Sequence, residues 1–168
     1  MSVDERMVHD IVQKVMANMQ ISGSVSGMHG VFKDMNDAIN ASIEAQKKVC
    51  TMTLDQREQI ISLIRKKTHE NAEILANMGV NETGMGNVGD KILKHHLTAD
   101  KVPGTEDIST IAWSGDRGLT LVEMGPFGVI GAITPATNPS ETVICNCIGM
   151  LAGGNTVVFN PHPAAVKT

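Results

Sequence analysis

The 168-residue sequence predicts an α/β fold in which helices come first, a β-hairpin follows, and a strand–helix–strand unit comes last. Two observations carry this prediction. Apolar residues recur at helical spacing up to about residue 100, and short apolar and β-branched runs replace that spacing after residue 105. Apolar residues make up 42% of the sequence, which is ordinary for a chain with a buried core.

The first half of the body is predicted to contain three helices. Residues 34–49 and 91–100 each keep a helical apolar spacing. Between them, the letters TLDQ at 53–56 match a capping box with Thr53 as the N-cap. The long helix that begins there is expected to stop at Gly79, because glycine tolerates the left-handed backbone that ends many helices.

The second half is predicted to contain the strands. Residues 108–122 form a β-hairpin around a five-residue loop at 114–118. Residues 128–134 and 155–160 form two buried strands joined by a helix over 140–151, which gives a right-handed βαβ unit. Two parallel strands are too few for a stable sheet, so we expect the chain to be cut off inside a domain.

Two loops are candidates for cofactor binding. A G-x-G-x-x-G pattern occupies residues 84–89, but a helix rather than a strand precedes it, so we interpret it as a loop and helix start. The crevice after strand 128–134 is the better site, since ligands bind beyond the carboxyl ends of parallel strands. Asn138 offers an amide donor there that can stabilise an oxyanion. On spacing alone, a simpler interpretation is favoured, in which Asn138 or Ser140 caps the following helix.

The composition excludes several classes of protein. A net charge of −4 and four aromatic residues argue against nucleic-acid binding. No run of about 18 apolar residues is present to cross a membrane, and the acidic start MSVDERMVHD is unlike a secretory signal. Three cysteines without a framework pattern indicate a reducing compartment, hence the cytoplasm.

The cysteines and histidines predict no metal site. Cys145 and Cys147 lie two apart on the helix over 140–151 and are expected to be buried structural residues. His95 and His96 are adjacent, so they cannot share one ligand-bearing helix face. No second pair completes a zinc pattern.

The first thirty residues differ in character from the rest. Residues 1–20 are predicted to form an amphipathic helix with an apolar stripe over 3–19, and residues 21–30 a flexible linker rich in serine and glycine. So short a helix cannot bury its stripe within itself. It therefore either packs on the body of the same protein or docks into a groove of another protein.

Three segments together resemble one family. They are ETGMGNVGDK at 82–91, GPFGVIGAITPATNP at 125–139 and GGNTVVFNPHPAA at 153–165. In this order they are similar to CoA-acylating aldehyde dehydrogenases, in particular the acetaldehyde and propionaldehyde dehydrogenases of bacterial microcompartments. The resemblance implies an aldehyde dehydrogenase-like fold, in which residues 31–168 are the N-terminal part of a Rossmann-type NAD-binding domain, truncated after its first βαβ unit.

The resemblance also implies an enzyme, an NAD-dependent oxidoreductase that converts a short-chain aldehyde to its acyl-CoA. A cysteine thiolate adds to the aldehyde, hydride passes to NAD, and coenzyme A takes the acyl group from the resulting thioester. The family's nucleophilic cysteine lies beyond residue 168, and none of Cys50, Cys145 or Cys147 matches it. This polypeptide alone is therefore expected to be inactive.

The family's pattern places site residues on two loops of this sequence. Asn138 in the T-P-x-T-N-P loop would donate to the oxyanion, or Thr137 would if the register against ordinary aldehyde dehydrogenases shifts by one residue. Backbone groups of four residues would line the nicotinamide: Thr134, Pro135, Ala136 and Thr137. Three residues stand at the adenosine-ribose position, where ordinary aldehyde dehydrogenases have Lys-Pro-x-Glu: Asn160, His162 and Pro163. Because no acid is present there to bind the ribose hydroxyls, the choice between NAD and NADP stays open.

The resemblance extends to partners. The stripe over 3–19 is similar to the encapsulation peptide with which such enzymes bind shell protein, which favours docking and implies the microcompartment lumen within the cytoplasm. The hairpin is similar to the arm through which the family forms homo-oligomers. Two alternatives stay open, namely a non-acylating, hydrolytic aldehyde dehydrogenase and a non-catalytic shell-interaction module.

The docking interpretation makes a prediction for the complete enzyme. Deleting residues 1–20 should leave aldehyde oxidation intact, because the site residues lie elsewhere, and should abolish association with shell protein. Co-sedimentation of the enzyme with assembled shells measures the association. Unchanged co-sedimentation of the shortened enzyme would contradict the docking interpretation.

Overall fold

The structure is a computed structural model that describes residues 30–168. The chain divides into two units, residues 1–33 and 34–168, and the second unit holds every helix and strand named below. The predicted helix over residues 1–20 and its linker, up to residue 29, lie outside the described residues. Within the described part of the chain, no helix combines the length and apolarity needed to span a bilayer.

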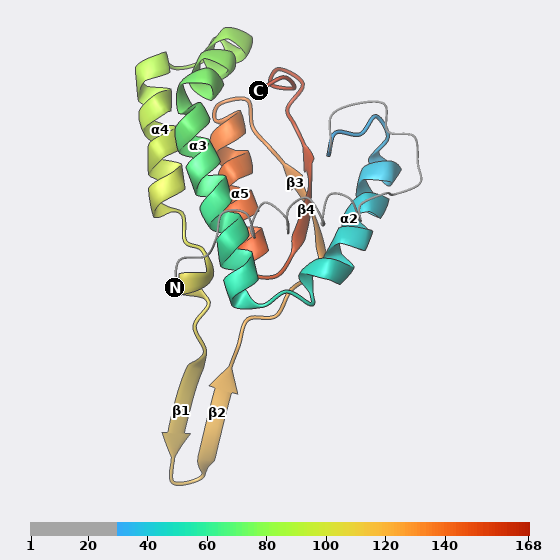
Figure 1. The fold of residues 1–168 in the computed structure, drawn as a ribbon, viewed down its shortest axis with the longest axis vertical. Coiled ribbons are helices and arrows are strands. Elements are labelled where there is room, and N and C mark those ends of the chain that lie inside the picture. Colours follow the sequence, from blue (N-terminus) through green and yellow to red (C-terminus); the bar gives the residue numbers. More distant parts are fainter. Residues whose placement is uncertain (1–29) are drawn as a thin grey trace, which may run out of the picture. The chain divides into compact units, whose positions relative to one another are not determined.

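Within residues 30–168, four α-helices pack with a small parallel sheet, and the first three begin at residues that cap them (Figure 1). They are α2 (Met35–Val49), α3 (Leu54–Thr83), α4 (Val88–Lys101) and α5 (Pro139–Ala152). Asp34 caps α2 by accepting from the Asn36 N–H, and the capping box predicted at Thr53 is confirmed, with both of its hydrogen bonds present. Asn87 caps α4 by accepting from the Asp90 N–H at 2.9 Å. Side-chain caps of this kind satisfy backbone donors that the helix itself leaves unpaired.

The long helix α3 does not stop at Gly79, as the sequence suggested, but continues to Thr83. Gly84 ends it, with a left-handed φ of +69°. Gly79 lies inside the helix, where an added Cβ would make only ordinary van der Waals contacts with Thr168 and Lys91, at 3.5 Å and 3.8 Å. The interpretation of residues 84–89 as a loop and helix start is confirmed, because they join α3 to α4.

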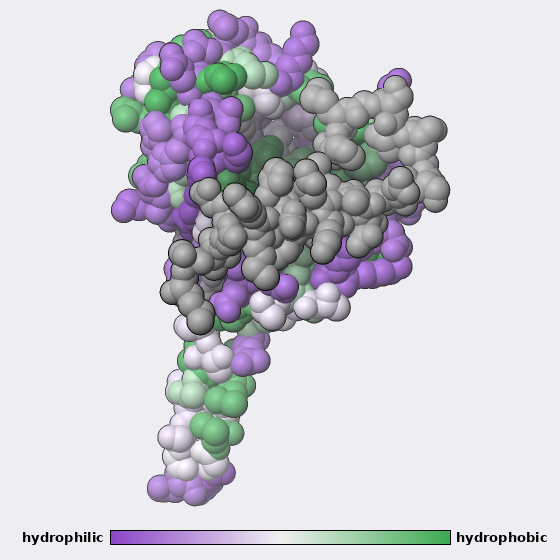
Figure 2. Space-filling model, in the orientation of Figure 1, coloured by the Kyte–Doolittle hydropathy of each residue, from purple (hydrophilic) through white to green (hydrophobic). Residues whose placement is uncertain are grey.

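The predicted hairpin is present, but its loop is shorter than expected. Strands β1 (Ile111–Gly115) and β2 (Gly118–Val122) pair antiparallel through to Gly115 and Gly118, so a two-residue turn replaces the predicted five-residue loop. Gly118 follows this turn with a φ of +139°, a backbone conformation that glycine adopts without steric cost. The hairpin extends away from the helices, and Figure 2 shows apolar residues along it. Its exposed apolar side chains include Ile111, Trp113, Leu119 and Leu121.

The second sheet confirms the predicted βαβ unit. Strands β3 (Val129–Ile133) and β4 (Thr156–Asn160) pair in parallel, and α5 connects them. Asn155 joins the end of this connection to the start of β3, since its Oδ1 accepts from the N–H groups of Phe127 at 2.6 Å and Gly128 at 3.0 Å. Figure 1 shows the two strands between α2 on one side and α5 on the other.

The buried core lies where α3 packs against α5. Ile61 of α3 and Ile148 of α5 are both fully buried, and Ala152 is buried beside them. Burying an aliphatic side chain of this size stabilises the fold by about 1.5–3 kcal/mol. Arg57 adds a polar contact at the same interface by donating to the carbonyl of Ala152 at 2.6 Å. The packing of α3 on α5 therefore fixes the position of the loop that precedes α5.

Candidate functional site

The carboxyl ends of the two parallel strands lie side by side. Ile133 and Asn160, the last residues of β3 and β4, are paired in the sheet register. One residue further, the N–H of Thr134 donates to the carbonyl of Asn160 at 3.2 Å. The loops after β3 and β4 therefore start at one edge, which is where ligands bind in open parallel sheets.

The residues predicted to bind the cofactor differ in exposure. Thr134 and Ala136 are buried, at 2% and 8% exposure, so their side chains face the protein. Four others are exposed: Pro135, Thr137, Asn160 and Pro163. The exposed His162 closes its own turn, because its Nδ1 accepts from the Ala164 N–H at 3.0 Å and its carbonyl accepts from Ala165.

The segment after β4 is tied back to the end of α3 by Glu82. Its carboxylate accepts from the Lys167 N–H at 2.9 Å and from the Thr168 hydroxyl at 2.6 Å. The hydrogen bond from Thr168 is the main cause that lowers the pKa of Glu82 below its usual value, with a smaller contribution from the Lys167 N–H. Glu82 is the first residue of the segment at 82–91 that resembles the family, and its hydrogen bonds hold the segment after β4 against the end of α3.

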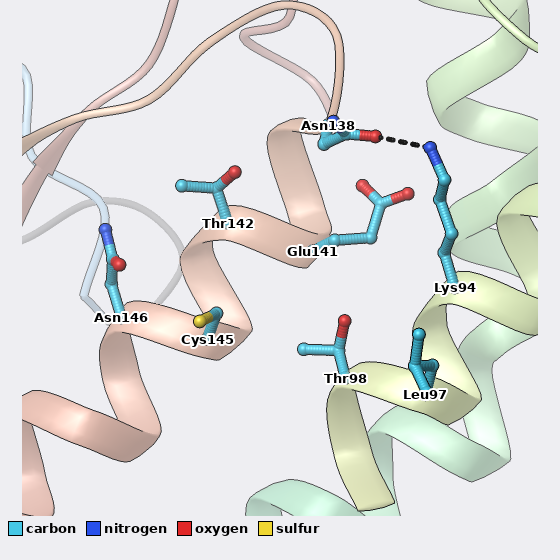
Figure 3. Close-up of a pocket in the computed structure, with 8 residues that line it drawn as sticks. All are labelled: Lys94, Leu97, Thr98, Asn138, Glu141, Thr142, Cys145 and Asn146. Atoms are coloured by element: carbon cyan, nitrogen blue, oxygen red, sulfur yellow. Dashed lines mark hydrogen bonds between the residues drawn. The ribbon is translucent and has the colours of Figure 1, made fainter. Parts of the chain in front are cut away.

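Asn138 stands at the N-cap position of α5 but does not cap the helix. No side-chain cap hydrogen bond forms there, although such a bond commonly contributes about 1 kcal/mol. Instead, the carboxamide Oδ1 accepts from Nζ of Lys94 at 3.2 Å, as Figure 3 shows. Ser140 does not cap the helix either, since its hydroxyl contacts His95 and Glu141. The interpretation of Asn138 or Ser140 as a simple cap is therefore wrong.

A buried polar cluster lies behind the loop that carries Asn138. Nζ of Lys91 donates to the carbonyl of Thr137 at 2.9 Å and lies 3.5 Å from the carboxylate of Glu141. The side chains of Lys91 and Glu141 are only 3% and 7% exposed. His95, fully buried, contacts the Ser140 hydroxyl through Nε2 at 2.9 Å. Its Nδ1 lies 2.7 Å from the Lys91 carbonyl, which can only accept, so Nδ1 is the donor.

An open pocket of about 290 Å³ lies between α4 and α5, beside Asn138 (Figure 3). Its lining comprises Lys94, Leu97, Thr98, Asn138, Glu141, Thr142, Cys145 and Asn146. The prediction that Cys145 is buried is wrong, because its side chain is exposed in this pocket. Cys147 is partly buried, and burial raises the pKa of its thiol.

Sequence reasoning missed the residues of α4 that contact the loop between β3 and α5. Lys91, Lys94 and His95 were not singled out as a group, although their spacing puts them on one helix face. His96 points elsewhere, as expected for an adjacent residue, and its ring stacks on His69, whose Nε2 lies 2.8 Å from Asp100. Among residues 30–168, no group of three or more His, Cys, Asp or Glu side chains is arranged to hold a metal ion.

Comparisons with known proteins identify the family of the chain. Residues 14–168 match the aldehyde dehydrogenase family. The chain is 46% identical to an acetylating acetaldehyde dehydrogenase of Bilophila wadsworthia, over 97% of this chain and 35% of that protein. It is 78% identical, with a TM-score of 0.79, to a propionaldehyde dehydrogenase from the fucose utilisation microcompartment of Clostridium phytofermentans, over 82% of this chain and 32% of that one. A Rhodopseudomonas palustris propionaldehyde dehydrogenase, solved with CoA and an acylated cysteine, is 49% identical with a TM-score of 0.79, over 84% of this chain and 33% of that one.

The chain therefore belongs to the aldehyde dehydrogenase family. The relatives that it matches include an acetylating acetaldehyde dehydrogenase and a propionaldehyde dehydrogenase with an acylated cysteine. The resemblance found in the three sequence segments is confirmed, as is the aldehyde dehydrogenase-like fold. The chain spans about a third of the length of the relatives named above.

The buried pair of Lys91 and Glu141 makes a prediction about stability. Replacing Lys91 by Met should lower the free energy of unfolding of the complete protein by about 3–5 kcal/mol, because Glu141 then keeps a buried charge without its partner. The double replacement Lys91→Met with Glu141→Gln should lower the free energy of unfolding less than Lys91→Met alone, because no unpaired buried charge remains. Denaturant titration followed by circular dichroism measures the differences.

Lys47 provides the matched control, since it pairs with Glu44 on the surface with both side chains more than half exposed. Lys47→Met should leave the unfolding midpoint nearly unchanged, because exposed pairs contribute little. Equal losses in the Lys47 and Lys91 variants would contradict the assignment of a stabilising buried pair.

Proposed function

We propose that this chain supplies the nicotinamide-side loop and one oxyanion donor of an enzyme that oxidises a short-chain aldehyde to its acyl-CoA. The support for the acylating reaction is the set of relatives, which include an acetylating acetaldehyde dehydrogenase and a propionaldehyde dehydrogenase with an acylated cysteine. The observation that carries the role of this chain is Asn138, whose carboxamide leaves the capping position and is held by Lys94.

The proposed contribution of Asn138 is electrostatic. When a thiolate adds to an aldehyde, negative charge develops on the aldehyde oxygen, and a positioned amide N–H stabilises that charge. The Oδ1 of Asn138 is already used by Lys94, so the Nδ2 end is the one that faces a ligand. Thr137 stays the alternative for the same task, since its side chain is exposed and its hydroxyl can also donate a hydrogen bond.

The edge at the carboxyl ends of β3 and β4 fits a dinucleotide. Pro135 and Thr137 are exposed on one loop, and Asn160 and His162 are exposed on the other. In the proposal, the first loop lies against the nicotinamide, and Asn160 and His162 lie near the adenosine ribose. The bound cofactor would accept the hydride. The segment from Asn160 to Thr168 contains no carboxylate, so it would not repel a 2′-phosphate, and either NAD or NADP is accommodated.

The proposed partners follow from the segments outside this edge. The exposed apolar side chains of the β1–β2 hairpin suit a contact with a second copy of the chain, as large exposed apolar surfaces commonly mark interfaces. Residues 3–19 are proposed to bind shell protein, which would place the enzyme in the lumen of a microcompartment within the cytoplasm. A relative from a fucose utilisation microcompartment supports this location.

A direct spectrophotometric assay on the complete protein tests the proposal. Purified protein is mixed with acetaldehyde or propionaldehyde and NAD, with and without CoA, and the absorbance of NADH is followed. CoA-dependent NADH formation, with acyl-CoA identified by mass spectrometry, is the expected result. Equal rates without CoA would indicate a hydrolytic aldehyde dehydrogenase instead. The absence of NADH with NAD, and of NADPH when NADP replaces NAD, would favour a non-catalytic shell-interaction module.

A further inference from the structure

One face of α4 contacts the candidate catalytic loop at three successive points. Lys91, Lys94 and His95 stand at positions i, i+3 and i+4, which share a helix face. They contact, in order, the Thr137 carbonyl, the Asn138 carboxamide and the Ser140 hydroxyl. All three contacts join segments more than forty residues apart in the sequence.

We propose that Lys94 is a positioning residue that selects the orientation of the Asn138 carboxamide for oxyanion stabilisation. This inference rests on the proposed function, because it assigns Lys94 a task in that reaction. Lys94 touches neither aldehyde nor cofactor in the proposal. It acts through its hydrogen bond to Oδ1 of Asn138.

The selection follows from the chemistry of the two groups. A carboxamide has an accepting oxygen and a donating nitrogen. A rotation of 180° about the Cβ–Cγ bond of asparagine exchanges their positions, so either end can face a ligand. A lysine ammonium group has three donors and no acceptor, so it can pair only with the oxygen. The contact with Lys94 therefore turns Nδ2 away from α4, and no residue within 30–168 accepts a hydrogen bond from that nitrogen. The reversed amide would present its oxygen to a developing oxyanion and repel it.

Lys91 completes the arrangement by holding the backbone. Its buried Nζ donates to the carbonyl of Thr137, which belongs to the peptide group just before Asn138. Rotation of that peptide would break a charged hydrogen bond inside the protein, where its loss is costly. The backbone of the loop is thus held by Lys91 and the side chain of Asn138 by Lys94. The two lysines have different tasks, one buried and structural, the other at the edge of the pocket in Figure 3.

A double-mutant cycle on the complete enzyme tests the inference. The variants are Lys94→Met, Asn138→Ala and the two together, with Lys94→Arg as the conservative variant. Lys94→Met should lower kcat roughly tenfold to a hundredfold, a typical effect of misplacing one catalytic group. The KM values for aldehyde, NAD and CoA should stay the same, since ground-state binding is untouched. In the Asn138→Ala background, Lys94→Met should have no further effect on kcat, because the group that it positions is gone.

Two controls separate positioning from general damage. Lys101→Met removes an exposed lysine from the same helix and should leave kcat and the thermal midpoint unchanged. Lys94→Arg should restore most of kcat, because a guanidinium group also donates to Oδ1. Should Lys94→Met unfold, Lys94→Gln replaces it, since glutamine keeps an apolar stem and a donor but loses the charge, and it should show an intermediate kcat.

The outcomes distinguish this inference from the proposed function. If wild-type enzyme forms NADH and Lys94→Met matches it, or lowers kcat by the same factor with and without Asn138, the positioning task of Lys94 is refuted while the proposed function stands. If wild-type enzyme forms neither NADH from NAD nor NADPH from NADP, the proposed function is refuted, and this inference with it.

Discussion

The ion pair between Lys91 and Glu141 is the constraint on which the candidate site depends. Its two side chains are almost fully buried, one on α4 and one in the first turn of α5. Isolated buried charges are expensive, so each of these groups requires the other. Because Lys91 also holds the Thr137 carbonyl, the same ammonium group fixes two helices and the loop between β3 and α5. The packing of Ile61 on Ile148 then fixes α5 against α3.

Much of the fold could be predicted because its signals are local. The capping box at Thr53 and the two apolar runs that became β3 and β4 depend on residues close in the sequence. Two errors arose where more than one glycine could end an element. Gly79 has the chemistry of a helix end, yet α3 continues past it to Thr83, and Gly84 ends the helix with a left-handed backbone. The hairpin loop was overestimated because Gly115 and Gly118 continue the pairing.

Part of the candidate site could be predicted from the sequence, and part could not. The family resemblance identified the loop from Thr134 to Asn138, and the sheet register brings that loop beside Asn160 as parallel strands require. The groups that hold the loop could not be predicted, because Lys91 and Lys94 meet it only through tertiary packing. An asparagine at an N-cap position usually accepts a hydrogen bond from the first turn of its helix, and Asn138 does not. Departures of this kind from local sequence preferences are typical of functional positions. The favoured capping interpretation failed because Oδ1 of Asn138 accepts from Lys94 instead of from the first turn of α5.

The central claim is that α4 presents the amide nitrogen of Asn138, rather than a group of Thr137, to the reacting oxygen. A crystal structure of the complete enzyme, trapped as its acyl-thioester, tests this claim most directly. The account predicts Nδ2 of Asn138 at about 3 Å from the thioester oxygen, with Lys94 still paired to Oδ1. A thioester oxygen held by Thr137, with the Asn138 side chain capping α5, would contradict it.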